Sequence, residues 1–209
     1  MALITSSSGL TSPLGGFRAA TLLDAPKHEP LALRLSAHGT PLHLDKNPGE
    51  SVEHLVLKAF MWALVLPTHP NAQCELDLGL RYRPDVVSLD AATGSSTPLF
   101  WGECGSVKPR KLKALAEAFP STAFAVAKWG RSDLRGYAAN LRTELDLPAD
   151  RAAPFELLNF PSTSIDDFLS DDGEIAIGFD DLTIVDLRPQ EEEQSSSSRA
   201  RGGKSRRRR

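Results

Sequence analysis

The sequence predicts an α/β fold in which helices flank a mixed β-sheet. Apolar residues recur with a helical period over residues 50–66, and a second helical stripe spans residues 109–119. Compact apolar runs of strand length stand at residues 84–89, 98–104 and 123–129. With 209 residues, the chain is long enough for one ordinary domain with a buried core.

The first elements follow from a change of period. In residues 31–35, leucine alternates with polar or small residues, which predicts a half-buried strand at the edge of a sheet. The turn signal Asn47-Pro48-Gly49 then precedes the helix of residues 50–66, which ends before Pro67.

Three strands and a second helix come next. Residues 75–81, 84–89 and 98–104 are interpreted as strands, the last two joined into a hairpin by the turn-rich loop 90–97. Pro109 suits the first turn of the following helix. The central order is therefore helix, three strands, helix, strand, an αβββαβ core.

The last part of the domain continues this alternation. Ser132 is the predicted N-cap of a helix with Leu134 and Leu145 on its apolar side. The remaining elements are a strand at 154–160, a short helix near 164–169 and a C-terminal β-hairpin of 174–179 with 182–187.

Composition divides the chain into a domain and two tails. Residues 1–20 and 190–209 are too poor in apolar residues to fold and are predicted to be disordered, which leaves residues 21–189 as a single domain. The Ser/Arg-rich tail 190–209 has seven basic and three acidic residues, whereas residues 1–189 have 17 basic and 24 acidic ones. An acidic domain excludes indiscriminate coating of nucleic acid, so any contact has to come from a local patch or from the tail.

Several protein classes are excluded. The stretch Ala59–Cys74 is broken by Pro67 and Pro70, so no membrane segment is predicted. Two cysteines and the absence of a secretory signal favour a soluble intracellular protein in a reducing compartment. The Arg206–Arg209 run is either a signal or a solubilising tail. As a signal it would bind nucleic acid or, in a eukaryotic chain, direct the protein to the nucleus.

Asp85 and Glu103 stand where the apolar pattern makes an acid costly. Asp85 opens the apolar run 86–89, and Glu103 ends the apolar run 99–102. In a hairpin, same-face neighbours lie about 5 Å apart, close enough to share a divalent cation. Two unpaired carboxylates would repel each other, so a positive group is expected between them, and oxygen ligands suit Mg²⁺ or Mn²⁺.

Glu50 and Glu53 lie three apart at the start of the first helix, where either could complete this cluster. Alternatively, both are ordinary first-turn acids that suit the helix dipole, and Asp85 points into water. Glu103 is harder to explain in this way, because it ends an almost uninterrupted apolar strand.

These motifs together resemble the PD-(D/E)xK nuclease superfamily, in which Pro-Asp opens one strand and Glu-x-Lys lies on the next. Pro84-Asp85 and Glu103-Cys104-Gly105 match, except that Gly105 stands where the lysine belongs. The sequence is most similar to the YaeQ family of that superfamily, over roughly residues 30–187. The matching segments are Asn47-Pro48-Gly49-Glu50-Ser51-Val52-Glu53, Leu57-Lys58-Ala59-Phe60, Gly79-Leu80, Trp101-Gly102-Glu103-Cys104-Gly105 and Arg110-Lys111-Leu112.

The resemblance implies a restriction-endonuclease-like fold and a metal-binding, nuclease-like site. Its implied metal ligands are Glu53 (or Glu50), Asp85, Glu103 and the backbone carbonyl of Cys104. Glycine at position 105 cannot provide the cation that stabilises developing negative charge in such a site.

A replacement cation is available at the start of the next helix, from Lys108, Arg110 or Lys111. We expect Lys111 or Arg110 to stabilise the phosphate. The basic residues of this region form either a phosphate track or a solvated helix face; they are Lys108, Arg110, Lys111, Lys113, Lys128, Arg131 and Arg135.

Other kinds of site have weaker support. The five histidines show no ligand spacing with the cysteines, so zinc is not expected, and His54 is interpreted as an exposed helix residue. Cys104 is a nucleophile only if a base is paired with it, and otherwise a buried structural thiol. No nucleotide-binding glycine motif is present, so no small-molecule organic cofactor is predicted.

Two functions follow as hypotheses. The first is a Mg²⁺-dependent nuclease of the YaeQ type, in which Glu53, Asp85 and Glu103 hold the metal that activates water. The second is a catalytically inactive module with a nuclease fold that binds nucleic acid or a protein partner. Glycine at position 105 and the acidic domain favour the second, and the sequence leaves the oligomeric state open.

Overall fold

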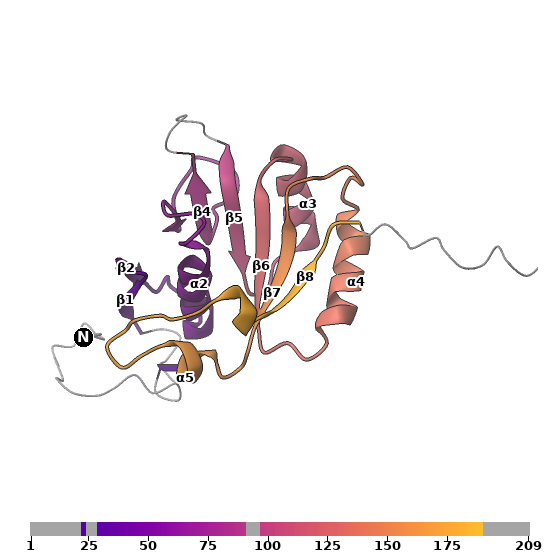
Figure 1. Ribbon diagram of the computed structural model, residues 1–209. Helices are drawn as coiled ribbons and strands as arrows, with labels where there is room; N and C mark the ends of the chain where they lie inside the picture. The colour runs from indigo at the N-terminus through magenta and orange to yellow at the C-terminus, as the bar shows by residue number, and fades with distance from the viewer. Residues whose placement is uncertain (1–21, 24–28, 91–96, 190–209) are drawn as a thin grey trace, which may run out of the picture.

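A six-stranded mixed β-sheet with helices on both faces forms the centre of the computed structural model, which describes residues 22–23, 29–90 and 97–189 (Figure 1). In spatial order its strands are β3 (Gln73–Cys74), β4 (Val86–Leu89), β5 (Pro98–Cys104), β6 (Ala123–Trp129), β7 (Phe155–Phe160) and β8 (Thr183–Asp186). The helices are α2 (Val52–Val65), α3 (Pro109–Ala118), α4 (Leu134–Leu145) and α5 (Ser164–Phe168). The predicted α/β class is confirmed. Along the chain, α2 is followed by β3, β4, β5, α3 and β6, but the first of these strands is the two-residue β3 and not the predicted strand 75–81.

Three parallel strands determine where a site can form. β5, β6 and β7 run parallel, connected through α3 and α4, while β4 and β8 pair antiparallel on either side of them. The carboxyl ends of the parallel strands therefore share one edge of the sheet, the usual place for ligands in open α/β sheets.

Apolar side chains form a separate cluster on each face of the sheet. Phe100 belongs to the cluster under α2, and its neighbour Trp101 belongs to the cluster under α3 and α4, as expected for successive residues of a strand. On the α2 side, the Phe60 ring stacks on those of Trp129 and Phe160, with centroids 5.9 and 6.2 Å apart.

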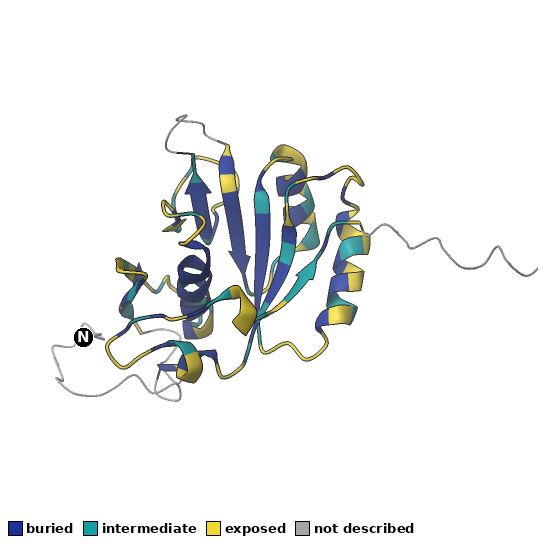
Figure 2. Ribbon diagram, in the orientation of Figure 1, coloured by how far each residue is buried: buried dark blue, intermediate teal, exposed yellow. Residues whose placement is uncertain are grey.

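Helix α2 is buried on nearly all sides, whereas its sequence period predicts that only one apolar stripe is buried. Figure 2 shows it dark blue almost throughout, whereas α3 and α4 have exposed outer faces. The β1–β2 hairpin packs against α2 in addition to the main sheet. The helix begins after Ser51, whose side chain accepts a hydrogen bond from the His54 N–H at 3.2 Å, so Glu50 lies just outside it.

The other helices follow the sequence pattern closely. Pro109 opens α3, as predicted. The predicted cap of α4 is wrong by one residue, because Asp133 rather than Ser132 accepts from the Gly136 N–H, at 3.0 Å.

Two strand predictions in the first half are corrected. The predicted edge strand is β1 (Ala32–Ala37), but it pairs with β2 (Thr40–Asp45) in a separate hairpin and not at the edge of the main sheet. No strand forms over 75–81, since β3 ends at Cys74 and Glu75 has a left-handed backbone conformation, with a φ of 54°. That conformation interrupts extended structure.

The predicted C-terminal hairpin is wrong. Strand β8 pairs with β7, antiparallel, and residues 174–179 contribute only isolated bridges, from Glu174 to Ser36 and from Ile175 to Leu169. A 3₁₀ turn at Phe179–Asp181 separates the two segments.

The tails predicted to be disordered, 1–20 and 190–209, lie outside the described residues, as does most of the loop 90–97. Within the described part of the chain, no helix is both long and apolar enough to cross a membrane.

Candidate functional site

The side chains of Asp85 and Glu103, brought side by side by the pairing of β4 with β5, line one cavity. Val86 pairs with Gly102 across β4 and β5, and the Asp85 N–H donates to the Gly102 carbonyl at 3.1 Å, which sets Asp85 opposite Glu103. Both acids line a cavity of about 550 Å³ at the end of β5. The start of α3 provides the opposite wall of this cavity, with Arg110 and Lys111.

Both carboxylate oxygens of Asp85 are hydrogen-bonded. Oδ2 accepts from the Cys104 backbone N–H at 2.6 Å, and Oδ1 lies 3.2 Å from Nε2 of His54. The side chain is 18% exposed, so it is oriented but reachable from the cavity. Cys104 thus contacts the acid through its N–H, while a role for its carbonyl as a metal ligand stays a prediction.

Glu103 is buried, with its two oxygens held by different donors. Oε1 accepts from Nε1 of Trp101 at 2.8 Å, and Oε2 accepts from Nζ of Lys111 at 2.5 Å. Burial raises the pKa of the Glu103 carboxyl, an effect that the two donors and the Lys111 charge oppose only in part and that the nearby Asp85 charge increases. Lys111 is therefore the counter-ion of the Glu103 carboxylate.

Gly105 has a backbone conformation that residues with a side chain rarely adopt, and it lies close to His54. Its φ is +68°, and a Cβ placed there would lie 3.2 Å from Nδ1 of His54. A lysine at this position would be strained by the backbone and would press on the imidazole. Lys111 instead reaches Glu103 from α3, and Arg110 is exposed on the same cavity wall.

Of the two candidate glutamates, Glu50 faces the cluster. Glu53 is exposed on the first turn of α2. The Glu50 side chain is 8% exposed, and its Oε1 lies 2.6 Å from Nζ of Lys58 and 3.5 Å from Nε2 of His54. Glu50 precedes the Ser51 cap and folds back, whereas Glu53 has no such contact to Lys58 or His54 among the described residues, although both glutamates line one cavity.

His54 is a member of the cluster and not the exposed helix residue that the sequence analysis expected. Its imidazole bridges Glu50 and Asp85, and it is only 30% exposed. Burial lowers the pKa of His54, but the hydrogen bond and charge of Asp85, together with Glu50, outweigh burial and the nearby Lys58, so the net pKa is raised.

Lys58, Glu75 and Asn47 are site residues that sequence reasoning missed. Lys58 is fully buried, and its Nζ lies 2.6 Å from Oε1 of both Glu50 and Glu75. The Asn47 side-chain amide donates to the same Glu75 oxygen at 2.7 Å. One signal was available, since a lysine inside the apolar run of α2 has to find a counter-charge.

Glu50, Glu75 and Asn47 line a second cavity of about 680 Å³, next to the first. His54, Cys104 and Ser106 line both cavities, so the imidazole stands between them.

The two cysteines are not suited to nucleophilic catalysis. Burial raises the pKa of Cys74 to about 12, and burial raises that of Cys104 well above its ordinary value, with the Asp85 charge adding to the effect. A thiol that stays protonated is a poor nucleophile, so both fit the interpretation as buried structural thiols.

Side chains able to bind a metal do not form clusters of three or more in the described part of the chain. Across residues 22–23, 29–90 and 97–189, no three Asp, Glu, His or Cys side chains lie close enough to hold a metal ion. Protein cations meet the carboxylates instead: Lys111 meets Glu103, Lys58 meets Glu50 and Glu75, and His54 meets Asp85.

The predicted basic track is split in two. Lys108 lines the first cavity with Arg110 and Lys111, whereas Lys113 points away and pairs with Asp146 at 3.5 Å. Lys128 is buried and donates to the carbonyl of Gly105, and Arg131 lies 4.1 Å from the centroid of the Tyr137 ring that Lys128 also faces. Arg135 is exposed at the start of α4.

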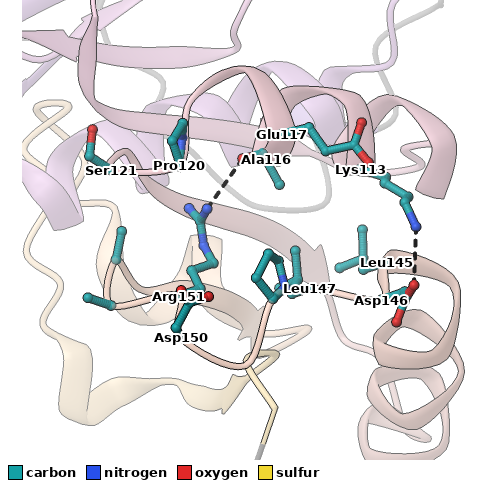
Figure 3. Close-up of a pocket in the computed structure, with 13 residues that line it drawn as sticks. Lys113, Ala116, Glu117, Pro120, Ser121, Leu145, Asp146, Leu147, Asp150 and Arg151 are labelled. Atoms are coloured by element: carbon teal, nitrogen blue, oxygen red, sulfur yellow. Dashed lines mark hydrogen bonds and ion pairs between the residues drawn. The ribbon is translucent and has the colours of Figure 1, made fainter.

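A larger cavity, of about 960 Å³, lies at the other end of α3 (Figure 3). Arg151 lines it and is 8% exposed; its guanidinium donates to the Ala116 carbonyl at 3.4 Å and to the Thr122 carbonyl at 2.6 Å. The same group faces the rings of Phe124 and Phe155, with centroids 5.4 and 5.6 Å away.

No protein-family model and no curated protein matches the sequence. Among solved structures, the fold is similar to that of the YaeQ protein from Xanthomonas axonopodis pv. citri, with a TM-score of 0.44 and 15% sequence identity. The match covers 64% of this chain and 72% of that one. Because this likeness is weak, function has to be argued from the residues of the site.

Proposed function

We propose that the protein is a Mg²⁺- or Mn²⁺-dependent phosphodiesterase of the PD-(D/E)xK type that cleaves nucleic acid at the cavity of Asp85 and Glu103. One observation supports this proposal above the others. Two carboxylates from adjacent strands line a single cavity whose opposite wall carries Arg110 and Lys111. Acids that can hold a metal thus face cations that can hold a phosphate.

The donor set fits a small, hard cation. Asp85, Glu103 and the backbone carbonyl of Cys104 would offer only oxygen, the ligand that Mg²⁺ prefers. Mg²⁺ is usually bound by one or two protein carboxylates, several waters and the phosphate of the substrate, so the small number of acids here suits an ion that arrives with its substrate. When bound, the ion would lower the pKa of a water and polarise the phosphate.

The chain itself orients the reacting groups. The Cys104 N–H and His54 fix both oxygens of Asp85, and Trp101 fixes one oxygen of Glu103. Lys111 supplies the positive charge that Gly105 cannot. The N-terminus of α3, whose cap Lys108 makes no side-chain capping bond, adds its positive dipole end beside the phosphate.

The second candidate is a binding module without catalysis, with nucleic acid or a protein as its partner. One observation favours it: Lys111, Lys58 and the imidazole of His54 already meet the carboxylates of the site. A site that supplies its own cations has less need of a metal, and its exposed Arg110 can still hold a phosphate.

Cleavage of labelled single-stranded and duplex DNA and RNA with Mg²⁺ or Mn²⁺ tests the two candidates. We expect Asp85→Asn to lower cleavage at least about 100-fold, the order of one electrostatic contact in a catalytic site. Asp146→Asn, which changes a carboxylate exposed at the far end of α4, is the matched control. No cleavage of any substrate with either metal, combined with retained binding, would favour the module.

A further inference from the structure

Lys58 is an unusual feature of the molecule, because an ammonium lies with no exposed surface in the middle of an apolar helix. An isolated buried charge of this kind is too costly to keep. Two carboxylate oxygens compensate it, one from Glu50 and one from Glu75, each at 2.6 Å. Burial lowers the pKa of Lys58, but the hydrogen bonds to Glu50 and Glu75 outweigh burial, so the net pKa is raised and the group stays charged.

Backbone conformations outside the regular helices and strands bring the carboxylates of Glu50 and Glu75 to Lys58. Glu75 adopts its left-handed φ of 54° directly after β3, and its N–H donates to the Asp85 carbonyl at 3.0 Å. Glu50 folds back so that its Oε2 accepts from the Asn47 N–H at 2.9 Å. A non-glycine residue in this conformation is costly, and such strain concentrates at functional sites.

The set of oxygens around Lys58 is of the kind that binds a divalent cation. Two carboxylates converge on one point, and the Asn47 amide nitrogen orients Glu75 by donating to the same oxygen. The cavity of about 680 Å³ gives access to these groups from outside, while Lys58 arrives from the helix interior. Hard cations prefer such oxygen ligands.

We propose that Lys58 is a built-in cation that takes the place of a second metal ion between Glu50 and Glu75. It keeps Glu50 in contact with His54, and through it orients Asp85. A divalent ion is then confined to the Asp85 and Glu103 side. This consequence rests on the proposed function, and it makes the reaction one that uses a single metal. Lys58 is a positioning residue in this account.

Replacing the lysine should convert the salt bridge into a metal site. Lys58→Met leaves two carboxylates, 8% and 20% exposed, without a cation, and we expect a fall in Tm of about 10 °C in metal-free buffer. Millimolar Mn²⁺ should restore at least half of this fall, because a ligand that binds only the folded state stabilises it. Electron paramagnetic resonance should count one more bound Mn²⁺ per chain than in wild type.

The controls separate metal binding from simple loss of a salt bridge. Lys128→Met removes another buried lysine, which donates to a carbonyl rather than to a carboxylate, and should show no rescue by Mn²⁺. Lys58→Met combined with Glu75→Gln should lose both the extra Mn²⁺ and the rescue. These readouts need no cleavage, so they distinguish failure of this inference from failure of the proposed function.

Two results would overturn the proposal. The first is a folded Lys58→Met protein whose Tm does not rise when Mn²⁺ is added and which binds no more Mn²⁺ per chain than wild type. The second is a protein that stays unfolded in millimolar Mn²⁺ as both Lys58→Met and Lys58→Gln, since an ion able to take the place of the lysine would have restored the fold.

Discussion

The two ends of the sheet each bury a cation, and they neutralise it in different ways. At the carboxyl edge, Lys58 lies between the carboxylates of Glu50 and Glu75. At the other end, Arg151 contacts carbonyls and aromatic rings, and no carboxylate of the described residues forms an ion pair with it. The first arrangement gathers charges that a ligand can rearrange, whereas the second uses fixed dipoles.

The difference indicates which end carries chemistry. The guanidinium of Arg151 joins the C-terminal end of α3, the start of β6 and the segment before β7, with its charge on the negative end of the α3 dipole (Figure 3). This is a structural clamp. The acids at the carboxyl edge are instead paired with side-chain cations, Lys58 and Lys111.

The largest effect on stability is expected at the clamp. Arg151→Ala leaves the Thr122 and Ala116 carbonyls without their donor and removes the stem that packs on the rings, so the free energy of unfolding should fall by about 3 kcal/mol. Urea unfolding measures this change. Cleavage per folded molecule should be unaltered, and a loss of cleavage larger than the unfolded fraction would contradict the division between the two ends.

A smaller, pH-dependent loss is expected at Glu103. Lys111→Met removes the ammonium from a buried carboxylate, which should cost about 2 kcal/mol at pH 8. Because Lys111 lowers the pKa of Glu103, its removal raises that pKa further, so Glu103 takes up a proton at a higher pH than in wild type and the loss is smaller at pH 5 than at pH 8. Chemical unfolding at both pH values tests this, and the loss should become independent of pH when Glu103→Gln is added.

His54 should give the site its own pH response. Its folded pKa is raised above 6.5, so the stability it contributes is complete below pH 6.5 and is lost as the pH rises through the raised value. We expect about 1 kcal/mol from this source in metal-free buffer. His54→Gln, which keeps a polar group of similar reach, should flatten the unfolding free energy above pH 6.5; an unchanged slope would mean that His54 is not the titrating group.

The smallest effect on stability is expected at an ion pair on the surface. Lys113 and Asp146 form an exposed pair, 38% and 84% exposed and 3.5 Å apart. Lys113→Met should change the free energy of unfolding by less than about 0.5 kcal/mol and leave cleavage unchanged. A larger loss of nucleic-acid binding would show that the phosphate-contacting surface extends along α3, away from the cavity.

Local patterns were enough to predict most of the fold. The α2, α3 and α4 helices and the β4 to β7 strands follow from period and, for α3, from Pro109, because each element buries a face that its own residues define; only the cap of α4 was misplaced, at Ser132 instead of Asp133. The predictions at 75–81 and 174–179 failed although alternating residues there satisfy the strand pattern: Glu75 adopts a left-handed conformation that interrupts the first segment, and β8 rather than the second segment pairs with β7.

The site was predictable only where its residues lie within strands. Asp85 and Glu103 could be paired because a hairpin places its strands side by side. Lys58, Glu75 and Asn47 meet through a backward fold before a helix and a left-handed residue after a strand, neither of which leaves a periodic signal. Their contacts depend on tertiary structure, so spacing along the chain could not bring them together.

The close approach of Gly105 to His54 also restricts how this protein can change over evolutionary time. Putting a lysine at 105 alone would strain the backbone and crowd the imidazole. Losing the imidazole alone would leave one Asp85 oxygen without its partner, while the other would still accept from the Cys104 N–H. Positions 105 and 54 are therefore coupled, and a side chain at one of them can be accommodated only with a change at the other.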